Sequence, residues 1–303
     1  MTTAIERPEV QAFYDRGSGT FTYVVYCTQT NLGAVVDPVL DLDYASGTIS
    51  AGSADRVVEF VVGHNLSITH LLETHVHADH LSAAPYLQAK LGGNIAIGSQ
   101  ITGVQQIFAE IFNEGSDFVP DGGQFDLLFD DGQGFEIGEI QASAMHVPGH
   151  TPACMAYLIG DALFVGDTLF MPEAGTARCD FPGGDAKTLY RSIKKLLALP
   201  EQTRVFVCHD YPEDDQRERY ETTIAHQRDA NIHVGGTITE EEFVIMREAR
   251  DVTLEMPSLI LPSLQVNMRA GRMPPVDQSG RLFLKVPINA FGGADITTLP
   301  QSK

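Results

Sequence analysis

The sequence has few basic residues and no long apolar run. Lysine and arginine together number 20 against 40 aspartate and glutamate residues, which gives a formal net charge of −20. Nucleic acids and anionic membrane surfaces bind proteins through basic patches, so neither is expected as a partner. The purely apolar runs are far too short to span a bilayer.

Cysteine is also scarce. Cys27, Cys154, Cys179 and Cys208 are scattered along the chain and form no C-x-x-C pair. This pattern is typical of a reduced compartment and not of a disulfide framework. Residues 1–16 contain acidic side chains but no apolar segment of the kind found in a secretion signal or transit peptide. We therefore expect a cytoplasmic protein.

The few cations are unevenly distributed along the chain. Before residue 151 only Arg7, Arg16, Arg56 and Lys90 are basic, and the other sixteen basic residues lie from Arg178 onward. Two interpretations remain open at this point. The bias is either ordinary surface composition, or the second half of the chain supplies cations for a small anionic substrate.

Strands and helices are expected to alternate along the chain. Stretches rich in β-branched and aromatic residues predict strands at 20–27, 33–36, 68–73, 140–145, 154–159, 162–165 and 204–208. Helical spacing predicts helices at 53–65, 80–91, 101–112, 185–199 and 239–250. Ser53 and Asp185 are candidate N-caps, and Thr239 with Glu242 has capping-box spacing.

This alternation predicts an α/β protein. We expect one domain over residues 1–303, with a core at about 18–250. The proline-rich tail at about 251–303 is expected to be irregular and to wrap around that core.

Four polar segments each follow a predicted strand directly. They are T-H-V-H-A-D-H at 74–80, P-G-H-T at 148–151, V-G-D-T at 165–168 and C-H-D-Y at 208–211. Ligand sites of α/β folds gather outside the carboxyl ends of strands. The four segments are therefore expected to meet at one edge of the molecule.

The first of these segments is the most specific. Side chains of an extended segment alternate between its two faces, so His75, His77 and Asp79 can point the same way. His80 turns back toward the same space if it opens the following helix. Burying these groups without a metal would be costly, and imidazoles with a carboxylate suit zinc or iron. The other segments complete the donors for one or two ions: His150, Asp167 and His209.

In this order, the four segments resemble the metallo-β-lactamase superfamily, whose fold is an αββα sandwich, over about residues 21–211. That superfamily includes lactamases, glyoxalase II thioesterases, nucleases, flavoproteins and sulfur dioxygenases, so the fold alone does not settle the reaction. Further motifs resemble its persulfide dioxygenase family and extend the likeness to about Gly271. They are T-F-T-Y (20–23), P-G-H-T-P-x-C (148–154), A-R-C-D-F (177–181), K-T-L-Y (187–190), H-D-Y (209–211), E-E-F (241–243) and N-M-R-A-G (267–271).

This resemblance implies an iron-dependent oxidoreductase. The family uses O₂ to oxidise the outer sulfur of glutathione persulfide, which gives sulfite and glutathione. Carried over, its single Fe(II) ligands fall on His75, His150 and Asp167, a two-histidine, one-carboxylate face. The remaining residues of the catalytic set would orient these ligands: His77, Asp79, His80 and His209.

The resemblance also implies glutathione contacts at Arg178, Tyr211 and Arg269. Arg178 and Arg269 are expected to pair with the glutathione carboxylates, and Asp180 to position Arg178. An ordinary surface ion pair is the alternative for each arginine.

Two features depart from the family pattern. The stretch between the first two polar segments is longer, mainly within 101–134, and this insertion is expected to cover the site, to reshape substrate access or to form a homodimer contact. The family's G-x-G-R-T-D-F is G-T-A-R-C-D-F at 175–181, which indicates a different loop around the thiol tail.

Other functions remain open. Because donors for two metals are present, the main alternative is a binuclear zinc thioester hydrolase that resembles glyoxalase II, in which a metal-activated water attacks the thioester. A metal-dependent binding or sensing protein without turnover is the third possibility.

Overall fold

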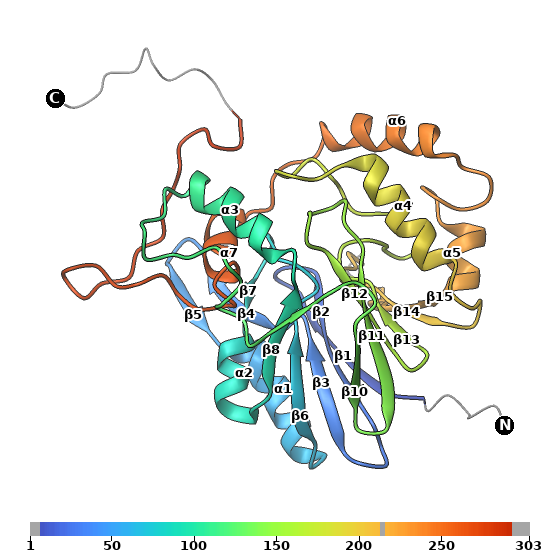
Figure 1. Cartoon of the computed structure of the whole chain (residues 1–303), viewed down its shortest axis with the longest axis horizontal. Helices are drawn as coiled ribbons and strands as arrows, with labels where there is room; N and C mark the ends of the chain where they lie inside the picture. Colours follow the sequence, from blue (N-terminus) through green and yellow to red (C-terminus); the bar gives the residue numbers. More distant parts are fainter. Residues whose placement is uncertain (1–6, 213–215, 293–303) are drawn as a thin grey trace.

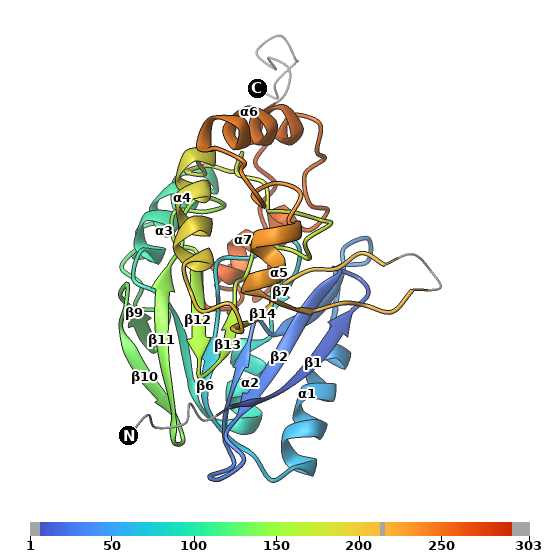
Figure 2. The same ribbon diagram turned by 90° about the vertical axis from the view of Figure 1, so that its right-hand side faces the viewer.

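The computed structural model describes residues 7–212 and 216–292 (Figure 1). Two six-stranded sheets face each other, and helices cover the outer face of each sheet (Figures 1 and 2). The predicted αββα sandwich is thereby confirmed. No helix in the described ranges is long and apolar enough to cross a membrane.

The first sheet has the strand order β1-β2-β3-β6-β8-β9. Its strands are β1 (Glu9–Asp15), β2 (Thr20–Tyr26), β3 (Leu32–Val36), β6 (Ser67–Leu72), β8 (Asn94–Gly98) and β9 (Leu127–Phe129). From β3 onward the neighbours run parallel, so the carboxyl ends of β3 and β6 lie at the same edge. A small sheet beside that edge pairs β4 (Val39–Asp43) with β5 (Thr48–Ser50) and β7 (Leu81–Ser82).

The second sheet has the order β10-β11-β12-β13-β14-β15. Its strands are β10 (Gly134–Ile137), β11 (Ile140–His146), β12 (Met155–Ile159), β13 (Ala162–Phe164), β14 (Arg204–Phe206) and β15 (Glu221–Thr223). Only the β13–β14 pair is parallel, so these two strands end at the same edge. An isolated bridge between Thr20 and His209 ties that edge to the first sheet.

Helices form the two outer layers. Those packed with the first sheet are α1 (Gly52–Gly63), α2 (Ala84–Leu91), α3 (Ile101–Ile111) and α7 (Ile260–Asn267). Those packed with the second sheet are α4 (Ala186–Leu197), α5 (Ile224–Ala230) and α6 (Glu240–Asp251). Asp185 caps α4 through the Thr188 amide, and the capping box at Thr239 is present, so both predicted helix starts are confirmed.

Side chains that alternate along β2 explain why both faces of the first sheet are buried. Tyr23 and Val25 point between the two sheets, where they join Tyr157 and Phe164. Val24 points the other way, into the core beneath the helices. Full burial of one such side chain contributes roughly 1.5–3 kcal/mol. A strand with apolar residues on both faces is therefore stable only as an inner layer.

Several local predictions were wrong. Helix α2 begins at Ala84 and not at His80, because Leu81 and Ser82 pair with β4 and leave His80 in a turn. Ser53 is not an N-cap; it lies inside α1, and its amide donates to the Asp41 carboxylate 3.0 Å away.

The tail that was predicted to be irregular contains a regular element, α7, and strand β9 lies in the stretch 113–134. Both elements take part in burying the helical face of the first sheet.

Candidate metal centre

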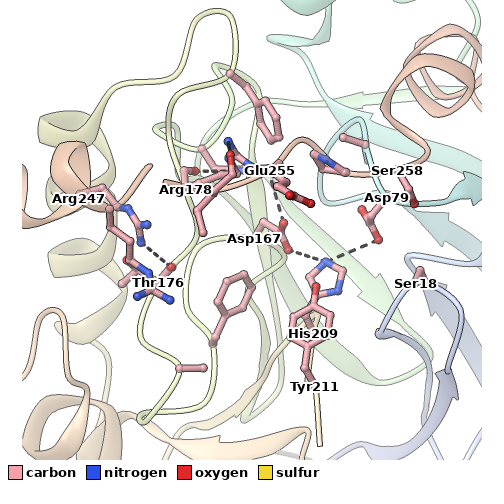
Figure 3. Close-up of a pocket in the computed structure, with 18 of the residues that line it drawn as sticks. Ser18, Asp79, Asp167, Thr176, Arg178, His209, Tyr211, Arg247, Glu255 and Ser258 are labelled. Carbon is pink, nitrogen blue, oxygen red and sulfur yellow. Dashed lines mark hydrogen bonds and ion pairs between the residues drawn. The ribbon is translucent and has the colours of Figure 1, made fainter. Parts of the chain in front are cut away.

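The four polar segments meet at one edge of the sandwich, as the sequence predicts. The 74–80 segment follows β6, and His150 lies in the turn after β11. Asp167 follows β13, and His209 follows β14. Figure 3 shows Asp79, Asp167 and His209 facing one another across the same space.

Three of these side chains form a compact group, called here the triad: His75, His150 and Asp167. Their ligand atoms all lie within 4.8 Å of one another. Asp167 Oδ2 lies 3.6 Å from His150 Nε2 and 4.0 Å from His75 Nε2, which is too far for hydrogen bonds. Within the described residues, the buried Nε2 of His75 has no hydrogen-bond partner. An orphaned, inward-facing imidazole nitrogen beside a carboxylate fits a metal ion.

The opposite side of each triad histidine is held by the protein. His75 Nδ1 lies 3.0 Å from the Thr74 hydroxyl, which in turn donates to Asp37 at 2.9 Å. His150 Nδ1 lies 2.7 Å from the Arg178 carbonyl oxygen. A carbonyl can only accept, so His150 Nδ1 carries the proton and its Nε2 lone pair faces Asp167.

Electrostatics keep the triad in the form that binds a metal. Burial, followed by the nearby charge of His77, holds the pKa of His75 well below its usual value, so this imidazole is neutral. Burial opposes ionisation of Asp167, but the charge and hydrogen bond of His209 outweigh it and hold the pKa of Asp167 well below its usual range. His75 therefore presents a neutral imidazole and Asp167 an anionic carboxylate.

His77 forms ion pairs with two buried carboxylates outside the triad, Asp37 and Glu73. Its Nε2 lies 3.0 Å from Asp37 Oδ1 and 3.7 Å from Glu73 Oε2. Burial opposes the charge, but Asp37 dominates and raises the pKa of His77 to about 10. His77 Nδ1 has no hydrogen-bond partner among the described residues, and the nearest carboxylate oxygen, on Asp79, is 3.9 Å away.

The remaining donors lie on the far side of Asp167. Asp79 Oδ2 accepts from the Thr20 hydroxyl at 2.7 Å and lies 3.0 Å from His80 Nδ1. His209 Nε2 lies 3.2 Å from Asp167 Oδ1 and 3.8 Å from Asp79 Oδ2. His77, Asp79, His80 and His209 are called here the second donor set. In the described chain, His209 groups with Asp167 and Cys208, whereas Asp79 groups with His77 and His80.

Helix α7 ties down the loop that carries the histidines. The Asn267 amide donates to the backbone carbonyls of His77 and His80 at 2.9 and 2.8 Å. Its oxygen accepts from the Ser82 amide at 2.8 Å. One side chain from the tail therefore fixes both ends of the His77–His80 turn.

An open cavity of about 510 Å³ reaches the triad from the surface (Figure 3). Tyr211, whose side chain is 72% exposed, stacks on His209 at its mouth, with ring centroids 5.9 Å apart. Arg178 lines the wall, but its guanidinium is bound to Asp180 at 2.6 and 2.7 Å and to the Glu255 carbonyl. Asp180 thus positions Arg178, as the sequence predicts, and leaves it little capacity for a substrate carboxylate.

The structure does not bring Arg269 to this cavity. Its guanidinium is buried, lies 2.8 Å from Glu114 and covers the ring of Phe118. Arg269 therefore fastens the tail to the insertion at 101–134. The segment around Glu114 already encloses the guanidinium, so Arg269 does not line the cavity where a contact with a glutathione carboxylate was expected.

A different cation is available to a substrate. Arg250, in the last turn of α6, is exposed and lines the cavity. In the described ranges its guanidinium has no ion-pair or hydrogen-bond partner. Neighbouring Arg247 cannot serve, because it is buried and paired with Asp251 at 2.6 Å.

Sequence reasoning missed four residues that shape the site: Asp37, Glu73, Asn267 and Arg250. Asp37 ends a predicted strand and Glu73 directly precedes the first polar segment, so both had the strand-end signal. Asn267 stands in the N-M-R-A-G motif two residues before Arg269. Arg250 carried no signal beyond the excess of late cations.

The sequence and the fold are similar to those of known proteins. The family described as the Metallo-beta-lactamase superfamily matches residues 15–209. A Burkholderia pseudomallei protein named "Probable metallo-hydrolase" is 49% identical over 93% of this chain and 99% of its own length. The Dictyostelium discoideum protein named "Glyoxylase B2" is 44% identical over 93% of this chain and 98% of its own length.

More distant relatives have a different name. The mitochondrial persulfide dioxygenase of Homo sapiens is 27% identical over 88% of this chain and 90% of its own length. The crystal structure of ETHE1 from Myxococcus xanthus superposes with a TM-score of 0.69 at 28% identity and covers 87% of this chain and all of that one. The similarity therefore extends well beyond the histidine motif.

Proposed function

The chain belongs to the metallo-β-lactamase superfamily, and from that premise we propose that it is a non-haem iron dioxygenase that oxidises the outer sulfur of glutathione persulfide. In this reaction the persulfide, O₂ and water give glutathione and sulfite. The S–S bond breaks, and the outer sulfur loses four electrons while O₂ gains four. The observation that carries the proposal is the triad, because two histidines and one carboxylate on one face are typical of iron oxygenases.

The position of His77 also supports a single ion. In a binuclear site, His77 would be expected to join the triad. Here its Nε2 forms an ion pair with Asp37 at 3.0 Å, and its atoms are not part of the group formed by His75, His150 and Asp167. When bound, Fe(II) would supply open coordination positions that bring a persulfide sulfur and O₂ together.

The protein would contribute orientation and charge. Thr74 and the Arg178 carbonyl fix the rings of His75 and His150 from behind. His209 would hold a proton beside Asp167, because the Asp167 charge outweighs burial and raises the pKa of His209 to about 9. These contacts keep the three ligands ready before substrate arrives.

The side chains at the mouth of the open cavity are suited to binding glutathione. Arg250 offers a free guanidinium for a carboxylate, and the exposed side chains of Tyr211, Ile232 and Leu254 offer surface to the peptide. Carboxylates line the deeper wall at Asp79 and Asp167. An anionic tripeptide is therefore expected to keep its carboxylates at the mouth and to extend its sulfur inward.

The second candidate is a binuclear zinc hydrolase of glutathione thioesters. Two observations favour it. The printed names of the more similar relatives are those of a metallo-hydrolase and a glyoxylase, whereas the persulfide dioxygenase is more distant. In addition, His77 Nδ1 and His80 Nε2 are buried without hydrogen-bond partners in the described chain, as donors to a second ion would be.

One preparation can test both candidates. Protein reconstituted with Fe(II) or with Zn²⁺ is given glutathione persulfide under O₂, or a glutathione thioester without it. The proposal predicts O₂ uptake and sulfite formation by the iron form, with no thioester cleavage above background. Thioester cleavage by the zinc form, with no O₂ uptake by the iron form, would replace the proposal with the second candidate.

A further inference from the structure

A second, much smaller cavity lies behind His150. Its volume is about 20 Å³. Val104 and Phe108 of α3 form one wall, and Ile260 and Leu264 of α7 form another. These four side chains are between 2% and 6% exposed, whereas Pro152 and Pro182, which also line the cavity, are partly exposed.

The walls of the small cavity offer few hydrogen-bond partners to a water molecule. Among the described residues, His150 and Thr151 are the only ones with polar side chains that line the cavity. The Thr151 hydroxyl is already paired with Cys154 Sγ at 3.0 Å, and His150 Nδ1 with the Arg178 carbonyl. A buried water needs two to four polar partners, and apolar cavities without them stay dry.

The small cavity meets the open one at the triad. Ala78, His150 and Phe181 line both. A molecule in the small cavity therefore lies against the imidazole of His150 without occupying the path through which a peptide substrate enters. The triad therefore borders two cavities: a large open one whose lining includes charged side chains, and a small one lined mainly by apolar side chains.

We propose that the small cavity is a binding site for O₂ beside the triad; this inference rests on the proposed dioxygenase function. O₂ is apolar and needs no hydrogen bonds, so dry apolar walls favour it over water. The volume of about 20 Å³ suits one small molecule and excludes a peptide thiol. A bound persulfide would then leave the route of O₂ open.

The same inference gives the insertion at 101–134 a role. Helix α3 lies within this insertion and supplies Val104 and Phe108 to the cavity wall. Gln105, on the same helix, donates to the Met268 carbonyl at 2.9 Å and so fixes α3 to α7. The insertion therefore covers the site on its apolar side.

Xenon tests the cavity independently of turnover, because it is an apolar gas that occupies dry cavities. The intact chain is crystallised, pressurised with xenon and compared with the Val104→Ile and Val104→Ala variants. We expect a xenon atom beside His150 in the unmodified chain, none in Val104→Ile, and higher occupancy in Val104→Ala. Val61→Ile is the matched control, since Val61 is also a buried helical valine but lies on α1, outside the cavity.

Kinetics test the use of the cavity. Val104→Ile adds one methylene to its wall, which should raise the KM for O₂ about tenfold. The KM for glutathione persulfide and the iron content should not change, and Val61→Ile should match the unmodified enzyme. Melting temperatures within a few degrees of the unmodified chain ensure that the variants compared are folded.

The outcomes separate the two proposals. No xenon beside His150, or an unchanged KM for O₂ in a folded Val104→Ile variant, overturns the O₂ site while the dioxygenase stands. Xenon at the cavity in a protein that consumes no O₂ with glutathione persulfide overturns the dioxygenase and, with it, the assignment of O₂ as the ligand. The cavity then remains a site for an apolar gas only.

Discussion

The triad and the second donor set contain the same residue types but are held in opposite ways. In the triad, His75 and His150 are held from behind by Thr74 and a backbone carbonyl, and their Nε2 atoms converge on Asp167. In the second donor set, Asp37 pairs with His77 and Thr20 donates to Asp79, while His77 Nδ1 and His80 Nε2 have no hydrogen-bond partner among the described residues. The difference teaches that ligand identity depends on which side chains converge on one carboxylate as well as on which atoms are unpaired.

The largest effect is expected for His150→Ala, which removes one triad ligand. Three protein ligands become two, so iron binding and O₂ uptake should be lost together. Iron per chain measured by mass spectrometry checks this. His64→Ala changes an exposed histidine remote from the cluster and should keep the full iron content. Retention of iron by His150→Ala would show that the triad is not the site.

Asp37→Asn is expected to have the next largest effect. Asp37 accepts hydrogen bonds from the amide and the hydroxyl of Thr74 and also pairs with His77, so its charge organises the loop behind the triad. Loss of such a partner typically lowers metal affinity about 10–100-fold. A competition titration against a chelator measures this shift. Equal affinity in the variant would mean that the loop is fixed without Asp37.

The His209→Ala variant distinguishes most clearly between ions bound by the triad and ions bound by the second donor set. His209 lies 3.2 Å from Asp167 but outside the triad. One iron per chain should therefore remain bound, while activity falls about tenfold because Asp167 loses its hydrogen-bonded partner. Metal content and O₂ uptake are measured on the same sample. A drop from two ions to one would instead favour the binuclear hydrolase.

The smallest effect is expected at the cavity mouth. Arg250→Ala should raise the KM for glutathione persulfide about fivefold, with kcat and iron content unchanged, because an exposed ion pair contributes about 1 kcal/mol. Arg250→Lys should recover part of the loss. Arg217→Ala provides a comparison at another late arginine. An unchanged KM for Arg250→Ala would remove this residue from the substrate site.

The fold and the convergence of the donor segments follow from the sequence. Strand ends carrying His75, His150 and Asp167 could be expected at one edge because the alternation of elements predicted an α/β protein, and the resemblance to the metallo-β-lactamase superfamily implied the sandwich. His80 shows the limit of that reasoning. Its backbone conformation depends on pairing between β4 and β7, which local propensity does not determine.

The remaining wrong or missing predictions concern residues whose contacts depend on partners far away in the sequence. Arg269 and Arg250 are both late cations, yet Glu114 buries one and no described residue pairs with the other. Asn267 holds the backbone of His77, which lies 190 residues earlier in the chain. Neither contact is visible in local patterns, because the tail reaches the insertion at Glu114 and the loop at His77 only in the folded chain.

The metal content of the unmodified chain tests the central claim most directly. The protein is loaded anaerobically with Fe(II) and, in a parallel sample, with Zn²⁺, desalted, and measured by native mass spectrometry. We predict one tightly held iron per chain, bound through the triad, and O₂ uptake with glutathione persulfide in that form. Two tightly held zinc ions per chain, with no O₂ uptake by the iron-loaded sample, would contradict the account.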